Sequence, residues 1–378
     1  MLRYRTISSW TSRISSSRLF PSLRTPTTTP VRRGIMTSTR NLPGSTMFLE
    51  GSEAAPECRI FLLTISKASA RFPENTLASF EAAIRDGAEG IESDVHVSLD
   101  NVVVMFHDPE LGRTTNSTGK IREREWYGEE GMQHIRTTKE PHQSIPTFAE
   151  TISLLMLPEN QHVNFNVDVK VQNTPARLFA LMHETISAHP NWETLLAPRI
   201  LLGLWHPSFL APAKEQLPYC RRSYIGNSPT IARKYFWNDC EVFSIAFAAL
   251  TSSDGERFRK ECKAGGKKLM VWTVNDPDHM MEAVRWEVDV ILTDVTKTWL
   301  DLRTALRSDY EKIAARYSRF FLWTSIRFYP PVRFIRAVVN REHLESVAGP
   351  VRQAQNQPGA GRPRVYDGVV AWRQALNE

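Results

Sequence analysis

Between residues 58 and 304 the chain alternates eight short runs of β-branched and apolar residues with stretches of helical periodicity. The β-rich runs are residues 59–65, 89–97, 163–170, 199–205, 223–227, 241–247, 268–274 and 288–293. The helical stretches are residues 76–86, 147–157, 175–188, 207–216, 228–236, 254–264, 277–286 and 296–307. Strands joined through helices form parallel sheets, and eight such units in one chain predict a closed (β/α)₈ TIM barrel. An open, doubly wound sheet is the alternative.

The first helical stretch, residues 76–86, carries signals at both ends. Asn75 or Thr76 is expected to cap the free amides at its start, and Gly87 favours the left-handed conformation that ends a helix.

The expected barrel has one irregular connection, an insertion after its second strand. It begins with "NVVVMFHD" (residues 101–108), which predicts a hairpin partner for residues 89–97 with a turn at Asp100–Asn101. A long loop follows that a simple βα unit does not need. Long insertions at the carboxyl ends of barrel strands commonly carry the functional residues.

Two carboxylates lie two residues apart in the second expected strand, "EGIESDVHV". A strand sends residues i and i+2 to the same face, so Glu92 and Asp94 would lie side by side and repel each other. A divalent cation between them would remove this repulsion. The alternative is an exposed edge strand with an acidic polar face.

The third expected strand repeats this spacing with Asp168 and Lys170. In a barrel, both pairs would meet at one mouth, where three carboxylates form a hard-ligand site suited to Mg²⁺ or Ca²⁺. Lys170 would offer its charge to a phosphate group, and His107 in the insertion is placed for proton transfer near neutral pH.

Residues 72–121, "FPENTLASFEAAIRDGAEGIESDVHVSLDNVVVMFHDPELGRTTNSTGKI", resemble the glycerophosphodiester phosphodiesterase family, with its PENT, ExD and HD-x-x-L-x-R-T-T elements in order. The later "VDVK", "VWTVND" and "VDVILTD" are similar to the motifs of its third, seventh and eighth strands. "IRTTKEPHQSIPTFAETISLL" and "LLGLWHPSFL" are similar to the fungal branch that includes phosphatidylglycerol-specific phospholipase C.

The resemblance implies a metal-dependent TIM-barrel hydrolase of a glycerophosphodiester, or of a glycerophospholipid head group such as that of phosphatidylglycerol. The three carboxylates would hold the metal, and Lys170 would contact a non-bridging phosphate oxygen. His107 would act as a general acid or base, and Trp272 of "VWTVND" would contact the substrate.

One family element does not match. A His-Arg-Gly triplet ends the first strand of the family, eight residues before the proline of PENT, where this chain has Ile65, Ser66 and Lys67. The catalytic His is thus replaced by Ile65, and the phosphate-binding Arg by Ser66. Either the chain is a catalytically impaired protein that keeps the fold and binds lipid, or its first exon is misjoined and the true strand carries the triplet.

The charge of the chain is concentrated at its ends. Before residue 50 there are eight arginines, no lysine and no acidic residue, and residues 304–378 carry a net charge of +6. Because the whole chain also carries +6, residues 50–303 carry −8. An acidic central domain argues against a nucleic-acid-binding core.

Residues 1–50 form a basic extension rich in Arg, Ser and Thr, a composition typical of a mitochondrial transit peptide. The expected location is the mitochondrion or another intracellular membrane, where the cytosolic face is an alternative. The alternatives are a disordered basic tail, or an upstream extension that is not translated, with Met36 or Met47 as the true start.

The C-terminal segment, residues 305–345, is basic and aromatic. Within it, residues 315–339 interleave five arginines with seven aromatic residues and contain no acid, which predicts peripheral contact with an anionic membrane. The alternative is a terminal helix that packs on the barrel through its aromatic residues. Residues 346–378 are rich in Pro, Gly and Gln and are expected to be disordered.

Overall fold

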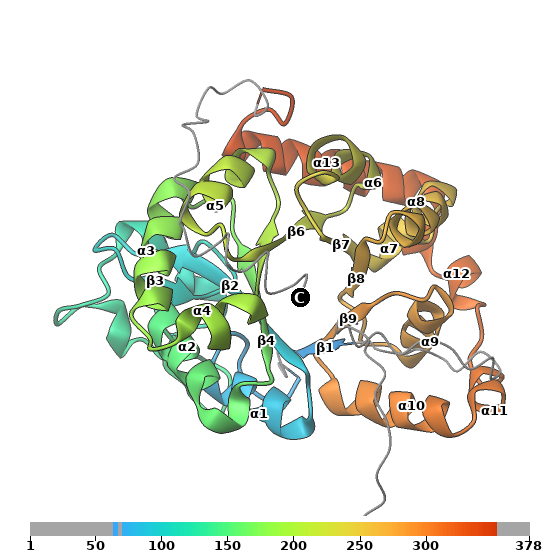
Figure 1. The fold of residues 1–378 in the computed structure, drawn as a ribbon, viewed down its shortest axis with the longest axis horizontal. Helices are drawn as coiled ribbons and strands as arrows, with labels where there is room; N and C mark the ends of the chain where they lie inside the picture. The colour runs from blue at the N-terminus through green and yellow to red at the C-terminus, as the bar shows by residue number, and fades with distance from the viewer. Residues whose placement is uncertain (1–62, 67–69, 354–378) are drawn as a thin grey trace, which may run out of the picture. The chain divides into compact units, whose positions relative to one another are not determined.

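The computed structural model describes residues 63–66 and 70–353, which contain a closed barrel of eight parallel strands (Figure 1). Each strand pairs in parallel with the next, and β1 pairs with both β9 and β2, which closes the sheet. The barrel strands are β1 (Leu63–Ser66), β2 (Gly90–Val97), β4 (Asn164–Val169), β5 (Ile200–Leu204), β6 (Arg221–Gly226), β7 (Val242–Ala246), β8 (Lys268–Trp272) and β9 (Val290–Thr293). The predicted TIM barrel is confirmed, and the open sheet is wrong.

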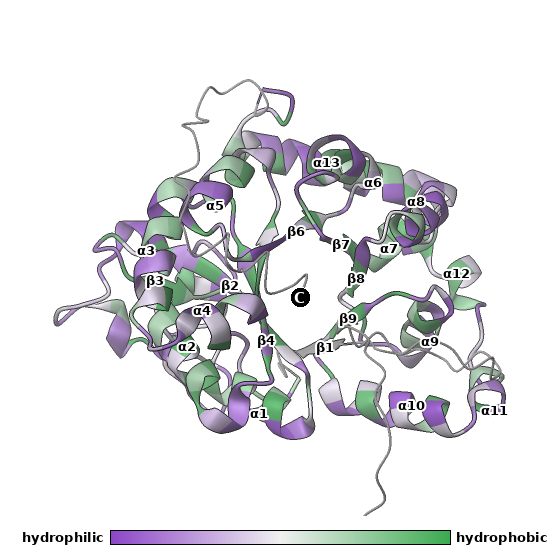
Figure 2. Cartoon of the chain, viewed as in Figure 1, coloured by the Kyte–Doolittle hydropathy of each residue, from purple (hydrophilic) through white to green (hydrophobic). Residues whose placement is uncertain are grey.

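Helices follow the strands and surround the barrel (Figure 1), and hydrophilic and hydrophobic residues both occur in this outer layer (Figure 2). They are α1 (Leu77–Asp86), α2 (Phe148–Met156), α3 (Pro175–Ser187), α5 (Leu210–Gln216), α6 (Pro229–Ile231) with the π-helical turn η7 (Ala232–Phe236), α8 (Ser253–Ala264), α9 (Pro277–Arg285) and α10 (Thr296–Ser308). Shorter helices are α4 (Trp192–Leu195) and α7 (Phe247–Leu250).

The ends of α1 show how local sequence sets an element. The hydroxyl of Thr76 accepts a hydrogen bond from the Ser79 amide, so Thr76 and not Asn75 is the cap. Gly87 ends the helix with φ +100°, the left-handed conformation that glycine adopts without strain.

Aromatic side chains fill the layer between strands and helices. Phe148 of α2 stacks on Phe165 of β4 with ring centroids 6.1 Å apart, and both are fully buried. On the opposite side, Trp237 stacks on Phe243 of β7, and Phe258 of α8 meets Phe243 edge-on. Such contacts anchor the outer layer to the strands.

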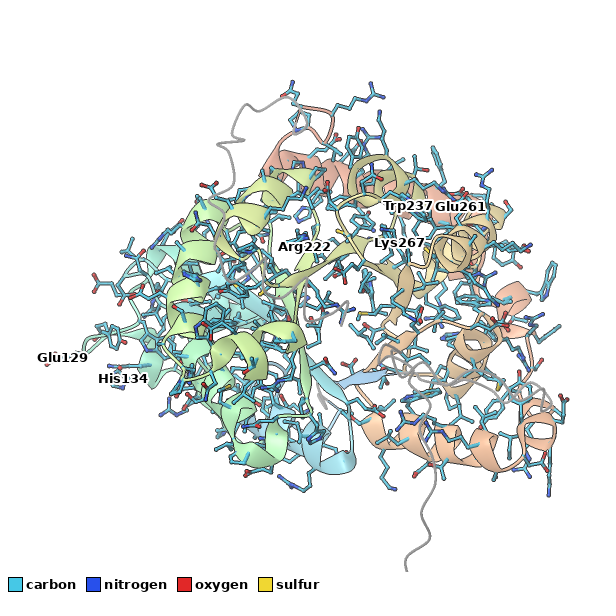
Figure 3. All side chains as sticks on the ribbon, in the orientation of Figure 1. Glu129, His134, Arg222, Trp237, Glu261 and Lys267 are labelled. Carbon is cyan, nitrogen blue, oxygen red and sulfur yellow. The ribbon has the colours of Figure 1, made fainter. Side chains whose placement is uncertain are left out.

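The insertion after β2 begins with the predicted hairpin. Strand β3 (Val103–Met105) pairs antiparallel with β2, and Asn101 in the turn adopts φ +69°. The Asp100 carboxylate accepts hydrogen bonds from the amides of Trp126 and Tyr127, which ties the turn to the loop beyond. The insertion has a small core of its own, formed by Val104, Phe106, Leu111, Ile121, Trp126, Met132, Ile135 and Ile145. Figure 3 shows Glu129 and His134 at its outer edge, away from the barrel.

After α10 the chain continues as α11 (Tyr310–Ala314), α12 (Phe321–Thr324) and the 19-residue helix α13 (Pro330–Ala348). The boundary expected at residue 345 is therefore wrong, because α13 runs three residues further and the described chain reaches residue 353. The expectations for residues 1–50, and for disorder in residues 354–378, fall outside the described part of the chain.

The aromatic residues of the C-terminal segment divide into two groups. Phe321 and Phe328 pack against His279 and Phe247 of the barrel, as the packing alternative expected. Phe320 and Trp323 instead remain exposed. Across residues 63–66 and 70–353, each helix is too short or too polar to cross a membrane.

Candidate active site

The register between β2 and β4 brings the predicted carboxylates together. Asp94 lies opposite Asp168, and Glu92 lies opposite Asn166. One oxygen from each of the three carboxylates lies within 4.8 Å of the others, and all three residues are buried. Because β2 is a buried strand between β1 and β4, the exposed-edge alternative is wrong.

One ammonium group serves two of these carboxylates. The Lys170 nitrogen lies 2.7 Å from Oδ1 of Asp94 and 2.8 Å from Oδ2 of Asp168. Burial raises the pKa of Asp168, as does the nearby Asp94, while Lys170 acts in the opposite direction. With all four groups ionised, the cluster carries two surplus negative charges, which matches the charge of a divalent cation.

Neighbouring side chains orient the two aspartates. Asn75 of the PENT motif donates to Oδ2 of Asp94 (2.9 Å) and accepts from the hydroxyl of Ser93 (2.5 Å). The indole nitrogen of Trp205 donates to Oδ1 of Asp168 (2.6 Å). The sequence predicted neither role, since both contacts join residues that are far apart in the chain.

Asn166 is a further polar residue that the sequence reasoning missed. It lies two residues before Asp168 on the same strand face and is almost completely buried. Among the described residues, neither its amide oxygen nor its amide nitrogen has a hydrogen-bond partner. A buried polar group of this kind ordinarily binds a ligand, ion or water. Together with the carboxylate oxygens, it therefore fits a hydrated Mg²⁺ or Ca²⁺.

His107 lies just beyond β3, beside the carboxylate cluster, and lines the same cavity. Its Nδ1 lies 2.7 Å from Asp108, and Arg113 joins Asp108 to Glu74 of the PENT motif. Burial alone would raise the pKa of Asp108, but hydrogen bonds from Arg113 and His107 outweigh it and the pKa is lowered. The ionised Asp108 thus orients the imidazole, and Nε2 remains for proton exchange.

His96 has a different role, although it lies close by. It is buried, which lowers its pKa to about 4, and its Nε2 lies 3.2 Å from the carbonyl oxygen of His107. The imidazole is therefore neutral at pH 7 and donates to the backbone that carries His107.

Two tryptophans form an aromatic wall beside the cluster. Trp272, at the end of β8, meets Trp205 with ring centroids 5.7 Å apart, and both line the cavity. The Lys170 nitrogen lies 5.8 Å from the centroid of Trp205. The structure therefore places Trp272 in the predicted cavity, next to the residue that binds Asp168.

The positions that differ from the family lie on the last two residues of β1. Ile65 pairs with Gly90 and Leu292, and Ser66 pairs with Ile91 and Thr293, so the backbone reaches the barrel mouth. The side chains of β1 and residues 67–69 are outside the described part of the chain.

One cavity of about 1000 Å³ is lined by the carboxylate cluster, Lys170, His107, Asn166 and the two tryptophans. Its floor is polar, with the three carboxylates, Lys170, His107 and Asn166. Helix α13 forms another part of the lining, through Phe334, Ala337, Val338, Asn340, Arg341, His343 and Leu344.

Comparisons with known proteins agree with this architecture. The glycerophosphoryl diester phosphodiesterase family matches residues 68–298. The chain is 24% identical over 239 residues to a glycerophosphodiester phosphodiesterase of Caldanaerobacter subterraneus subsp. tengcongensis, which covers 62% of this chain and 93% of the relative. It is 25% identical over 241 residues to a probable glycerophosphodiester phosphodiesterase 2 of Mycobacterium tuberculosis, covering 60% of this chain and 83% of that protein.

Among solved structures, a phosphodiesterase of Oleispira antarctica in complex with the product sn-glycerol-3-phosphate is similar with a TM-score of 0.54 and 23% identity. The similarity covers 64% of this chain and 95% of the other, and it shows the shared fold. The family match spans more than half of the chain and includes the carboxylate cluster, Lys170, His107 and Trp272. The chain thus belongs to the glycerophosphoryl diester phosphodiesterase family.

Proposed function

We propose that this protein is a metal-dependent phosphodiesterase that hydrolyses a glycerophosphodiester or the head group of a phosphatidylglycerol-like glycerophospholipid. One observation carries the proposal: Glu92, Asp94 and Asp168 gather within 4.8 Å in a cavity that also holds Lys170 and His107. The motifs shared with the fungal phospholipase C branch support the lipid form of the substrate.

The three carboxylates and the Asn166 amide would hold Mg²⁺ or Ca²⁺. When bound, the cation supplies a Lewis acid for the phosphoryl oxygens and neutralises the charge that develops on them. Lys170 contributes a second positive charge to a non-bridging oxygen, and Asn75 and Trp205 keep the aspartates in place. Asp108 holds the imidazole of His107 ready to exchange a proton.

In the reaction, the oxygen of water or of a substrate hydroxyl forms a new bond to phosphorus, and the bond to the leaving oxygen breaks. The nucleophile loses a proton and the leaving alkoxide gains one. His107 serves one of these transfers through Nε2. The family performs the other with the histidine that Ile65 replaces.

The second candidate function is lipid binding without efficient catalysis. Its basis is the replacement of the family histidine by Ile65 and of the arginine by Ser66. Loss of a positioned acid or base typically lowers a rate by about 10²- to 10⁴-fold. A chain with this sequence would then keep the metal site and the cavity but turn substrate over slowly.

A peripheral membrane location fits the C-terminal segment. Phe320 and Trp323 are exposed in a segment rich in arginine, a combination suited to the head-group region of an anionic bilayer. A mitochondrial destination is supported by the basic, acid-free composition of residues 1–50. A fluorescent fusion of residues 1–50 tests the destination, and a cytosolic signal would contradict it.

The direct test of function compares the purified protein with an Ile65→His, Ser66→Arg, Lys67→Gly variant. Both are assayed with Mg²⁺ or Ca²⁺ on phosphatidylglycerol in mixed micelles and on glycerophosphoglycerol. Hydrolysis by the natural chain would support the proposed phosphodiesterase activity. Hydrolysis by the variant alone would support the second candidate function, lipid binding without efficient catalysis. Absence of turnover in both, with the metal bound, would contradict the proposed activity.

A further inference from the structure

Helix α13 lies beyond the barrel in sequence but forms part of the catalytic cavity. Of its cavity-lining residues, Phe334, Ala337, Val338, Arg341 and Leu344 recur at intervals of three and four. This spacing places them on one face of the helix. Asn340 and His343 extend the lining around the helix, while Ile335 and Val339 are exposed and absent from the cavity lining.

A hydrogen bond near its start joins α13 to the barrel. At its start, the guanidinium of Arg333 donates to the hydroxyl of Thr251, just after α7 (2.8 Å). Beyond its end, the Val351 amide donates to the Glu345 carboxylate of the same helix (3.3 Å), and Val351 is buried. Helix α13 lies over the sector of the mouth near β6 (Figure 1), and the residues that follow β6 also line the cavity.

The cavity therefore has two chemically different sides. The carboxylates and Lys170 form a charged floor, whereas α13 contributes four apolar side chains beside Asn340, Arg341 and His343. Phe334 is 71% exposed and Val338 is 38% exposed, although both line the cavity. A deacylated glycerophosphodiester is polar throughout and would leave these side chains in contact with water. The cavity, at about 1000 Å³, is at the upper end for a small-molecule site.

We propose that the cavity face of α13 binds the acylated glycerol of the substrate, with Phe334 and Val338 as specificity-determining residues. With the phosphate at the carboxylate floor, the first methylenes of the acyl chains would cover these two side chains. The helix then selects diacyl substrates over their deacylated counterparts. This inference rests on the proposed function, because it assumes that a phosphodiester binds at the floor.

The test uses a lipid that is monomeric in solution, so that membrane binding does not contribute. Dihexanoyl phosphatidylglycerol, below its micelle concentration, and glycerophosphoglycerol are titrated into the metal-loaded protein by calorimetry. Each buried methylene is worth about fourfold in affinity, so the natural chain should prefer the lipid by at least about tenfold. If the chain turns these compounds over, the ratio of their kcat/KM values replaces the ratio of Kd values.

The variant Phe334→Ser, Val338→Ser should reduce this preference to less than about threefold. The matched control is Ile335→Ser, Val339→Ser, which makes the same substitutions at the same i, i+4 spacing outside the cavity lining. This control should keep the preference for the lipid. Equal affinity of the natural chain for both compounds, or an unchanged preference in the cavity-face variant, would overturn the inference. Binding of glycerophosphoglycerol alone would overturn it while leaving the proposed function intact. Binding of neither compound would overturn both.

Discussion

The ammonium nitrogen of Lys170 lies 2.7 Å from Oδ1 of Asp94, and the same group is shared with Asp168 on the neighbouring strand. Since Lys170 is largely buried, this single cation offsets charge that solvent cannot reach. The contact joins β2 to β4 at the point where the metal is proposed to bind.

Replacement of Lys170 by Met should lower the free energy of unfolding by about 3–5 kcal/mol at pH 7, because it leaves buried carboxylates without their cation. Addition of Mg²⁺ or Ca²⁺ should recover part of this loss. Urea unfolding with and without the metal measures both effects. Lys260→Met, which removes an exposed pair with Glu256, is the control and should leave the free energy of unfolding nearly unchanged. Equal stability of the two variants would contradict the account.

His107→Asn should lower kcat by about 10²- to 10⁴-fold, because it removes the proton-transfer group while keeping a polar side chain. The assay uses whichever form of the chain is active, natural or with the restored His-Arg-Gly triplet. His134→Asn, at the outer edge of the insertion, is the matched control and should keep full activity. If the His107 variant is as active as this control, His107 does not take part in proton transfer.

Arg319→Ala should release the C-terminal segment from the barrel. Arg319 donates to both oxygens of Glu282 at 2.7 and 2.9 Å, and Glu282 is buried. Glu282 keeps a longer contact with Arg285 (3.3 Å), so loss of this fork weakens the pairing of a buried charge and should cost about 1–3 kcal/mol. Limited proteolysis should then cut the chain between residues 315 and 330 faster than in the natural protein. Arg257→Ala, on the surface of α8, should leave the cleavage rate unchanged.

The packing of the C-terminal segment should weaken in mild acid. Burial lowers the pKa of His279, and Arg327 acts in the same direction, so the folded protein favours the neutral imidazole. The unfolded chain, with a pKa near 6.5, then binds more protons. The contribution of His279 to the free energy of unfolding is complete above pH 6.5 and is lost as the pH falls below this value.

His279→Phe keeps an aromatic ring between Phe247 and Phe321 but cannot take up a proton. Between pH 7 and pH 5, the Tm of the natural protein should fall further than the Tm of this variant. Differential scanning calorimetry measures both changes. Identical slopes of Tm against pH would show that His279 does not contribute.

Most of the barrel was predictable because its strands and helices differ in local pattern. The pairs Glu92–Asp94 and Asp168–Lys170 were also predictable, since alternation in a strand and the convergence of parallel strands follow from geometry alone. The contacts of Trp205 and Asn75 were not, because each depends on a long-range approach that leaves no local signal. The same holds for α13, whose position depends on contacts such as that between Arg333 and Thr251.

The end of α13 shows a further reason for error. The Pro- and Gly-rich composition that predicts disorder begins at Gly349 and Pro350, beyond the predicted boundary at residue 346. The helix in fact continues to Ala348 and stops where glycine and proline remove helical preference.

The central claim is that the carboxylates of β2 and β4 bind one divalent cation. Titration calorimetry with Mg²⁺ or Ca²⁺ tests it on the natural chain, on Asp168→Asn, and on Glu256→Gln as an exposed acidic control. The account predicts binding of one ion per chain that is lost in Asp168→Asn and kept in Glu256→Gln. Absence of binding by the natural chain, or equal binding by all three proteins, would contradict it.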